Sequence, residues 1–177
     1  MTEKEFRQYA VYVTEKFGIQ LPKEKKALLE SRLYKLFHSE EGNEFHDAAG
    51  FFAFLQQDRS GKGRELLADA ITTNHTFFMR ETDHFSCFAE QVLPYWNERI
   101  RDGDVRTWCA ACSSGEEAYT LAMILQDYFS LKGPQWETTM LATDLSQEIL
   151  LTARAGIYPR EAIRTMPVHW QSAYFQS

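Results

Sequence analysis

Hydrophobic side chains recur at helical spacing over the first 72 residues. The first such stripe contains Phe6, Tyr9, Ala10, Val13 and Phe17, which fall on one face of a helix. Thr2 followed by Glu5 is the sequence signal of a capping box at the start of this helix. Three further helices are expected before residue 72, one of them capped by Asp47. The pattern therefore predicts an all-helical N-terminal domain over residues 1–72.

After residue 72 the pattern changes to alternating helices and strands. The expected order is a helix over 83–96 with a kink near Pro94, a short buried strand over 105–111, a helix over 116–129, a second strand over 138–143, and a helix capped by Ser146. A strand, a helix and a second strand in this order predict a parallel pair with a right-handed crossover. The second domain, residues 73–177, is therefore expected to be α/β.

Composition and charge exclude several classes of protein. The chain has 177 residues and a formal net charge of −6, which argues against nucleic-acid binding because phosphates require a basic surface. No apolar stretch approaches the ~18 residues of a membrane span, and the charged N-terminus does not resemble a signal peptide. We therefore expect a cytoplasmic protein without membrane insertion. The five histidines lack metal-ligand spacing, and no metal is expected.

The turn after the first strand is the candidate ligand site. Residues 112–117 read Cys-Ser-Ser-Gly-Glu-Glu and lie at the carboxyl end of the strand, where open parallel sheets bind ligands. The small side chains in this turn allow a ligand to approach the backbone closely, and Asp144, which ends the second strand, is placed to accept hydrogen bonds from ribose hydroxyls. Glu116 and Glu117 would repel a pyrophosphate, whereas they suit the sulfonium and ammonium groups of S-adenosylmethionine. An ordinary capped turn between a strand and a helix is the alternative.

Three segments of the sequence resemble the chemotaxis receptor glutamate O-methyltransferases. Residues 72–81 (TTNHTFFMRE) resemble the family's T-x-N-x-T-x-F-F-R-E segment, residues 108–123 (WCAACSSGEEAYTLAM) its W-S-A-A-C-S-T-G-E-E-P-Y-S-L-A-M motif, and residues 142–146 (ATDLS) and 155–158 (AGIY) its A-T-D-I-S and G-I-Y elements. The resemblance implies a helical N-terminal domain followed by a Rossmann-like, S-adenosylmethionine-dependent methyltransferase domain. Nothing matches the family's later N-V-x-I-Y-F region, so we expect this domain to be incomplete at its C-terminal end, in a fragment or a truncated relative.

The resemblance also implies roles for particular residues. Asn74, Thr76 and Arg80 would line the cofactor site, with Arg80 near the methionine carboxylate or the methyl-transfer centre. Glu117 would contact the cationic end of the cofactor, and Asp144 its ribose. The methyl acceptor would be a receptor glutamate, which is already ionised at neutral pH because its reference pKa is ~4.3. The reaction, which leaves S-adenosylhomocysteine, would then need no general base.

Each of these residues also has an ordinary structural interpretation. Arg80 could form a surface ion pair, which is worth little, and Asn74 could mark a helix boundary. Glu116 is expected to be a solvated acid of the first helical turn, and Phe77 and Phe78 are expected to belong to the core.

The resemblance suggests partners as well. Lys25, Arg32 and Lys35 belong to a basic second helix in an otherwise acidic chain, and the family associates such a helix with docking the acidic methylation region of the cytoplasmic part of methyl-accepting chemotaxis receptors. A solvated polar face is an equally good interpretation. Self-association is also expected, because an incomplete sheet exposes an edge.

Two other functions fit parts of the sequence. Trp108-Cys109-Ala110-Ala111-Cys112 resembles the W-C-x-x-C of thiol oxidoreductases. Nearby acids would raise the thiol pKa, however, whereas this chemistry needs the pKa lowered. A non-catalytic relative that binds S-adenosylmethionine, S-adenosylhomocysteine or a protein partner is the other alternative.

Overall fold

The computed structural model describes residues 1–176, which divide into two compact units. The first contains Met1–Thr73 together with Leu145–Gln147, and the second contains the rest of the described chain from Asn74 onward. Each unit has its own hydrophobic core, and the two are described separately.

The first unit is helical, as predicted. Its elements are α1 (Glu3–Phe17), a 3₁₀ turn (Lys23–Lys25), α2 (Lys26–Phe37), α3 (Ala48–Gln57) and α4 (Lys62–Ile71). The capping box at the start of α1 is confirmed, because the Glu5 N–H donates to Thr2 Oγ1 at 3.2 Å and the Thr2 N–H donates to Glu5 Oε2 at 2.6 Å. Asp47 caps α3 by accepting a hydrogen bond from the Gly50 N–H at 2.7 Å. Local sequence signals therefore set where these helices begin.

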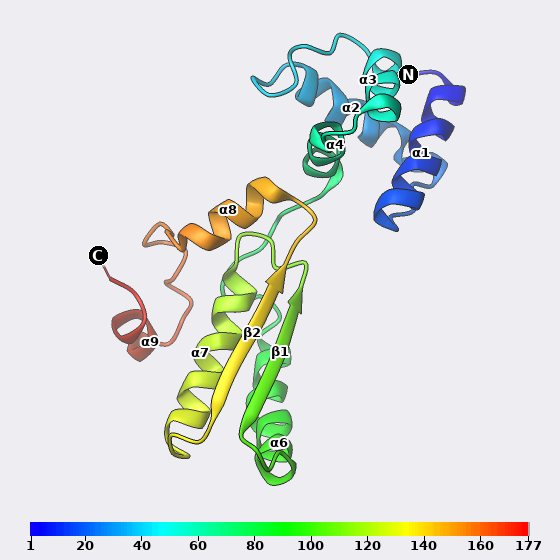
Figure 1. The fold of residues 1–177 in the computed structure, drawn as a ribbon. Helices are drawn as coiled ribbons and strands as arrows, with labels where there is room; N and C mark the ends of the chain where they lie inside the picture. Colours follow the sequence, from blue (N-terminus) through cyan, green and yellow to red (C-terminus); the bar gives the residue numbers. More distant parts are fainter. Residues whose placement is uncertain (177) are drawn as a thin grey trace. The chain divides into compact units, whose positions relative to one another are not determined.

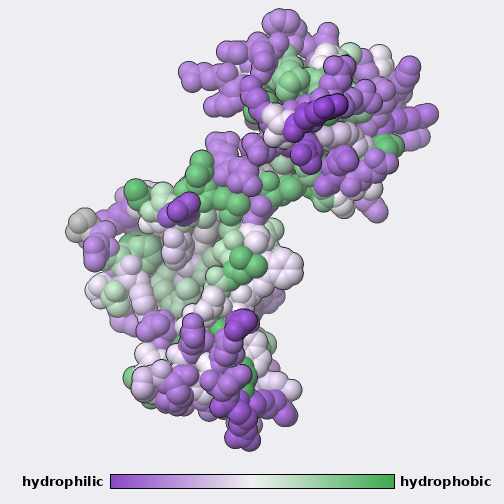
Figure 2. Space-filling view, viewed as in Figure 1, coloured by the Kyte–Doolittle hydropathy of each residue, from purple (hydrophilic) through white to green (hydrophobic). Residues whose placement is uncertain are grey.

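The apolar faces of the four helices meet in one core. Its most deeply buried members are Phe6, Tyr9, Val13, Leu29, Leu33, Phe51 and Leu67. The hydroxyl of Tyr9 donates to the Ala48 carbonyl at 2.7 Å, so the polar atom of this side chain keeps a partner inside the core. Charged and polar residues cover most of the visible face of this unit (Figure 2).

The second unit is α/β. Its elements are α5 (Thr82–Cys87), a π-helical turn (Phe88–Val92), α6 (Leu93–Arg99), β1 (Asp104–Ala110), α7 (Glu116–Ser130), β2 (Glu137–Thr143), α8 (Gln147–Ala155) and α9 (Val168–Ala173). In the described chain β1 and β2 form a two-stranded parallel sheet in which Trp108 lies opposite Leu141, and α7 runs alongside β2 (Figure 1). The irregularity expected near Pro94 is the π-helical turn. Proline has no N–H to donate, and its ring crowds the carbonyl four residues earlier.

The prediction of a buried strand over residues 105–111 is only partly right. The strand ends at Ala110, and its side chains alternate between buried and exposed. Val105 and Cys109 face the core, whereas Trp108 is 69% exposed. Successive side chains of a strand point to opposite faces, and α7 covers the face that carries Val105. The opposite face of the sheet places Trp108 beside Leu141, which is 59% exposed.

Within residues 1–176, no helix is long and apolar enough to cross a membrane. The same residues hold no group of three or more His, Cys, Asp or Glu side chains arranged to bind a metal ion.

Candidate cofactor site

The bend between β1 and α7 has an unusual backbone. Ala111, Ser113 and Gly115 all have positive φ, at 62°, 51° and 101°. Residues other than glycine rarely adopt this region, and such conformations cluster at functional sites, where the surrounding structure holds them. Here the Cys112 N–H donates to the Thr143 carbonyl at 2.9 Å, so the bend is tied to the end of β2.

Ser113 joins two of the predicted cofactor residues. Its N–H donates to Asp144 Oδ2 at 2.8 Å, and its Oγ donates to the Asn74 carbonyl at 3.1 Å. Only 9% of Ser113 is exposed. The bend, the end of β2 and the start of the 74–81 segment therefore meet at one buried serine, a connecting role that the sequence analysis did not assign.

The two acids that begin α7 have different surroundings. Glu117 is exposed and accepts a hydrogen bond from Cys109 Sγ at 3.4 Å. The expectation that Glu116 is solvated is wrong, because it is only 8% exposed and accepts a hydrogen bond from Ser114 Oγ at 2.6 Å. Both carboxylates lie at a helix N-terminus, where the helix dipole stabilises negative charge.

The 74–81 segment is shaped by Arg80. This arginine is exposed, and its Nη1 donates to the His75 carbonyl at 2.8 Å, which closes the loop between the two residues. The predicted place of Arg80 near the methyl-transfer centre stays a prediction, as does the contact of half-buried Thr76 with the cofactor. Phe78 is a core residue at 1% exposure, whereas the same expectation for Phe77 is wrong, because it is 49% exposed.

The two cysteines beside the bend are free thiols whose chemistry opposes disulfide exchange. Burial and then the Glu117 carboxylate raise the pKa of Cys109 to about 12. Burial and then the Asp144 carboxylate raise the pKa of Cys112 as well. The thiolate is the reactive species of a thiol oxidoreductase, so this alternative loses its chemical basis.

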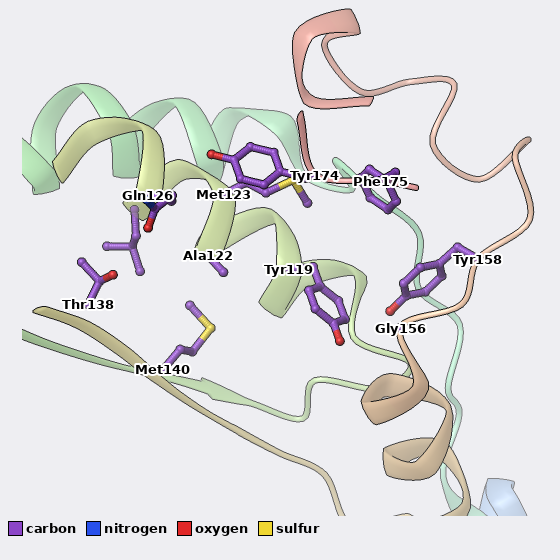
Figure 3. Close-up of a pocket in the computed structure, with 11 residues that line it drawn as sticks. Tyr119, Ala122, Met123, Gln126, Thr138, Met140, Gly156, Tyr158, Tyr174 and Phe175 are labelled. Atoms are coloured by element: carbon purple, nitrogen blue, oxygen red, sulfur yellow. The ribbon is translucent and has the colours of Figure 1, made fainter. Parts of the chain in front are cut away.

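An apolar pocket of about 430 Å³ lies between α7, β2 and the chain that follows α8 (Figure 3). Its walls include Tyr119, Met123, Met140 and Tyr158, and none of the lining residues within 1–176 is charged. The pocket therefore lacks the carboxylates expected to face a cationic ligand, and it is distinct from the site at the strand ends.

Tyr158 is a second residue whose place the sequence analysis did not find. Its hydroxyl donates to the Ser114 carbonyl at 2.5 Å, across 44 residues of sequence. The signal in the sequence is the G-I-Y element at residues 156–158, which belongs to the family resemblance but implies no role for Tyr158.

In the helical unit, Lys25 and Lys35 are exposed, and their docking role stays a prediction. The guanidinium of Arg32 is already engaged within the unit. It donates to the Ala70 carbonyl at 2.9 Å, to the Thr72 carbonyl, and to Thr73 Oγ1 at 2.6 Å. The last carbonyls of a helix lack N–H donors from a following turn, and the guanidinium supplies donors to carbonyls at the end of α4.

Comparison with known proteins gives matches over nearly the whole chain. Relatives named chemotaxis protein methyltransferase are 36% identical over 177 residues in Borreliella burgdorferi, 29% over 175 residues in Salmonella typhimurium and 30% over 176 residues in Escherichia coli. These alignments cover 98–99% of this chain and 57–62% of each relative, so the chain spans about 60% of their length. Residues 74–177 match the family described as CheR methyltransferase, SAM binding domain. The chain therefore belongs to the CheR methyltransferase family.

Proposed function

We propose that residues 74–177 bind S-adenosylmethionine at the carboxyl ends of β1 and β2. The observation that carries the proposal is the bond from the Ser113 N–H to Asp144, which holds the strained bend and the acidic end of β2 together. The family match over residues 74–177, whose domain is named for this cofactor, supports the choice of ligand.

The residues of the site fit this cofactor chemically. Asp144 supplies a carboxylate for ribose hydroxyls, and Glu117 supplies an exposed negative charge for the sulfonium or ammonium group. Asn74, Thr76 and Arg80 would complete the site from the 74–81 segment, with Arg80 directed to the methionine carboxylate or the reacting centre. Carboxylates lie on both sides of the bend, those of Glu116 and Glu117 at the start of α7 and that of Asp144 at the end of β2. Their negative charge disfavours a pyrophosphate and favours a cation.

We further propose that the protein transfers a methyl group to glutamate carboxylates of chemotaxis receptors. The relatives' names support this activity. The cofactor supplies an electrophilic methyl group, and the acceptor carboxylate is ionised at neutral pH. The site has then to position the two groups and exclude water rather than move a proton.

Calorimetric titration with S-adenosylhomocysteine tests the cofactor site. Asp144→Asn keeps an oxygen that can accept from Ser113 but removes the charge offered to ribose. Because hydrogen bonds to charged groups contribute about 1.5–3 kcal/mol, we expect affinity to fall about 10- to 100-fold. Asp102→Asn, in the turn before β1, is the matched control and should bind as the wild type does. Equal affinity of Asp144→Asn and wild type would contradict the role of Asp144, and absence of wild-type binding would contradict the site.

A separate experiment tests docking by α2 and the 3₁₀ turn that precedes it. We propose that Lys25 and Lys35 contact an acidic segment of the receptor's cytoplasmic region. Lys25→Glu combined with Lys35→Glu should weaken binding of a peptide from that region and leave the affinity for S-adenosylhomocysteine unchanged. Lys4→Glu, an exposed change on α1, is the control for a general effect of charge. Unchanged peptide binding by the double variant would remove the docking proposal.

A further inference from the structure

Tyr158 connects two separate parts of the proposed cofactor site. Its hydroxyl donates to the Ser114 carbonyl at 2.5 Å, in the middle of the bend. Its ring packs edge-on against Phe78 of the 74–81 segment, with 4.8 Å between ring centroids. One side chain thus contacts both the bend and the segment that carries Asn74, Thr76 and Arg80.

The bend is built to receive this side chain. A Cβ atom added at Gly115 would lie 2.8 Å from Tyr158 Oη, 3.1 Å from the Tyr119 ring and 3.2 Å from Ala153 Cβ. The missing side chain of Gly115 therefore admits the tyrosine of the same chain, not a ligand. Figure 3 shows Tyr119 and Tyr158 next to each other at the start of α7.

Tyr119 packs beside Tyr158 and is itself held in place by a hydrogen bond. Its hydroxyl donates to the Ala153 carbonyl at 2.9 Å, and its ring lies 6.0 Å from that of Tyr158. Burial raises the pKa of Tyr158 above its ordinary value, so the hydroxyl remains a donor over the whole physiological range. The position of Tyr158 is thus held by packing as well as by its hydrogen bond.

We propose that Tyr158 is a positioning residue for the cofactor, which braces the 113–115 bend and the 74–81 segment in their binding geometry. The inference rests on the proposed function. Ser113 keeps a left-handed backbone while its N–H holds Asp144, and such a conformation persists only where neighbouring contacts enforce it. The bond from Tyr158 to the adjacent Ser114 peptide is one such contact.

The test removes the hydroxyl alone. Tyr158→Phe keeps the ring on Phe78 and loses the bond to Ser114. Tyr174→Phe is the matched control, because it also removes a hydroxyl with a 2.5 Å hydrogen bond, to Asp127, away from the bend. We expect Tyr158→Phe to lower the affinity for S-adenosylhomocysteine about three- to tenfold, which is the range that one hydrogen bond supports. Its Tm should remain within the change that Tyr174→Phe produces.

A local measurement separates positioning from general stability. The Ser114 carbonyl belongs to the same peptide as the Gly115 N–H, so the Gly115 amide resonance should shift in Tyr158→Phe and stay unchanged in Tyr174→Phe. Equal affinity of Tyr158→Phe and wild type would overturn the inference and leave the cofactor site standing. An equal loss of affinity in both variants would also overturn it, because the effect would then be structural. Wild-type protein that does not bind S-adenosylhomocysteine would overturn both proposals.

Discussion

The close packing at Gly115 predicts a large penalty for a single added methyl group. Gly115→Ala places a Cβ on a residue with φ of 101° and 2.8 Å from Tyr158 Oη. A left-handed conformation costs an L-residue about 1–2 kcal/mol, and overpacking costs a further ~1–3 kcal/mol. We therefore expect the free energy of unfolding to fall by about 2–5 kcal/mol.

Gly133→Ala is a control that shares the energetic cost of a left-handed backbone at an alanine. Gly133 has φ of 109°, and the nearest atom to an added Cβ is Oε1 of Gln135, the far end of a side chain that can move. This variant should lose only the conformational term of about 1–2 kcal/mol. The difference between the two variants then measures the steric contact with the tyrosine.

Urea denaturation followed by tryptophan fluorescence suits this comparison, because all four tryptophans (Trp96, Trp108, Trp136 and Trp170) lie in the second unit. Removing the hydroxyl of Tyr158 should relieve part of the overlap. Gly115→Ala combined with Tyr158→Phe is therefore expected to be more stable than the sum of the two single changes implies. A penalty for Gly115→Ala no larger than that for Gly133→Ala would refute the packing argument.

Three further predictions concern stability and association. Asp47→Ala removes the cap that accepts the Gly50 N–H and should lower the free energy of unfolding by about 1 kcal/mol, as measured by circular dichroism of the helical unit. Because Cys109 has its pKa raised from 9.0 to about 12, the folded protein keeps this proton at alkaline pH while the unfolded chain loses it. Stability should therefore fall between pH 9 and 12, less steeply in Cys109→Ser, and identical pH profiles would contradict this. Leu141→Lys changes an exposed residue beside Trp108 and should alter stability by less than about 0.5 kcal/mol. It should reduce the expected self-association in sedimentation velocity; a wild-type protein that is monomeric at every concentration would show that expectation to be wrong.

The elements were predictable from sequence where a local cause determines them. The caps at Thr2 and Asp47 depend on side chains that bond to backbone within three residues, and the order of strands and helices follows from hydrophobic spacing. Burial on β1 was less predictable. The strand over 105–111 is expected to be buried as a whole, whereas the structure leaves the face that carries Trp108 open.

The site residues show the same division between local and distant causes. Asp144 and the bend could be paired from sequence, because the carboxyl ends of neighbouring parallel strands lie at one edge. The links made by Arg32 to the end of α4, and by Tyr158 to Ser114, join residues 38–44 positions apart. No periodicity connects such positions, so these contacts had to come from the structure.

The π-helical turn before α6 has a consequence for how the length of this segment can vary. Phe85 and Leu93 are both buried, although they are eight residues apart. In a regular α-helix an eight-residue step turns through about 800°, so the second side chain would point about 80° away from the first. The wider turn over Phe88–Val92 contains one residue more than an α-helical turn. Phe85 and Leu93 are therefore oriented as if they were seven residues apart in a regular α-helix, a spacing that returns a side chain to nearly the same face. Deleting one residue from that turn would therefore convert it to α-helix, and the side chains of Phe85 and Leu93 would both still point into the core.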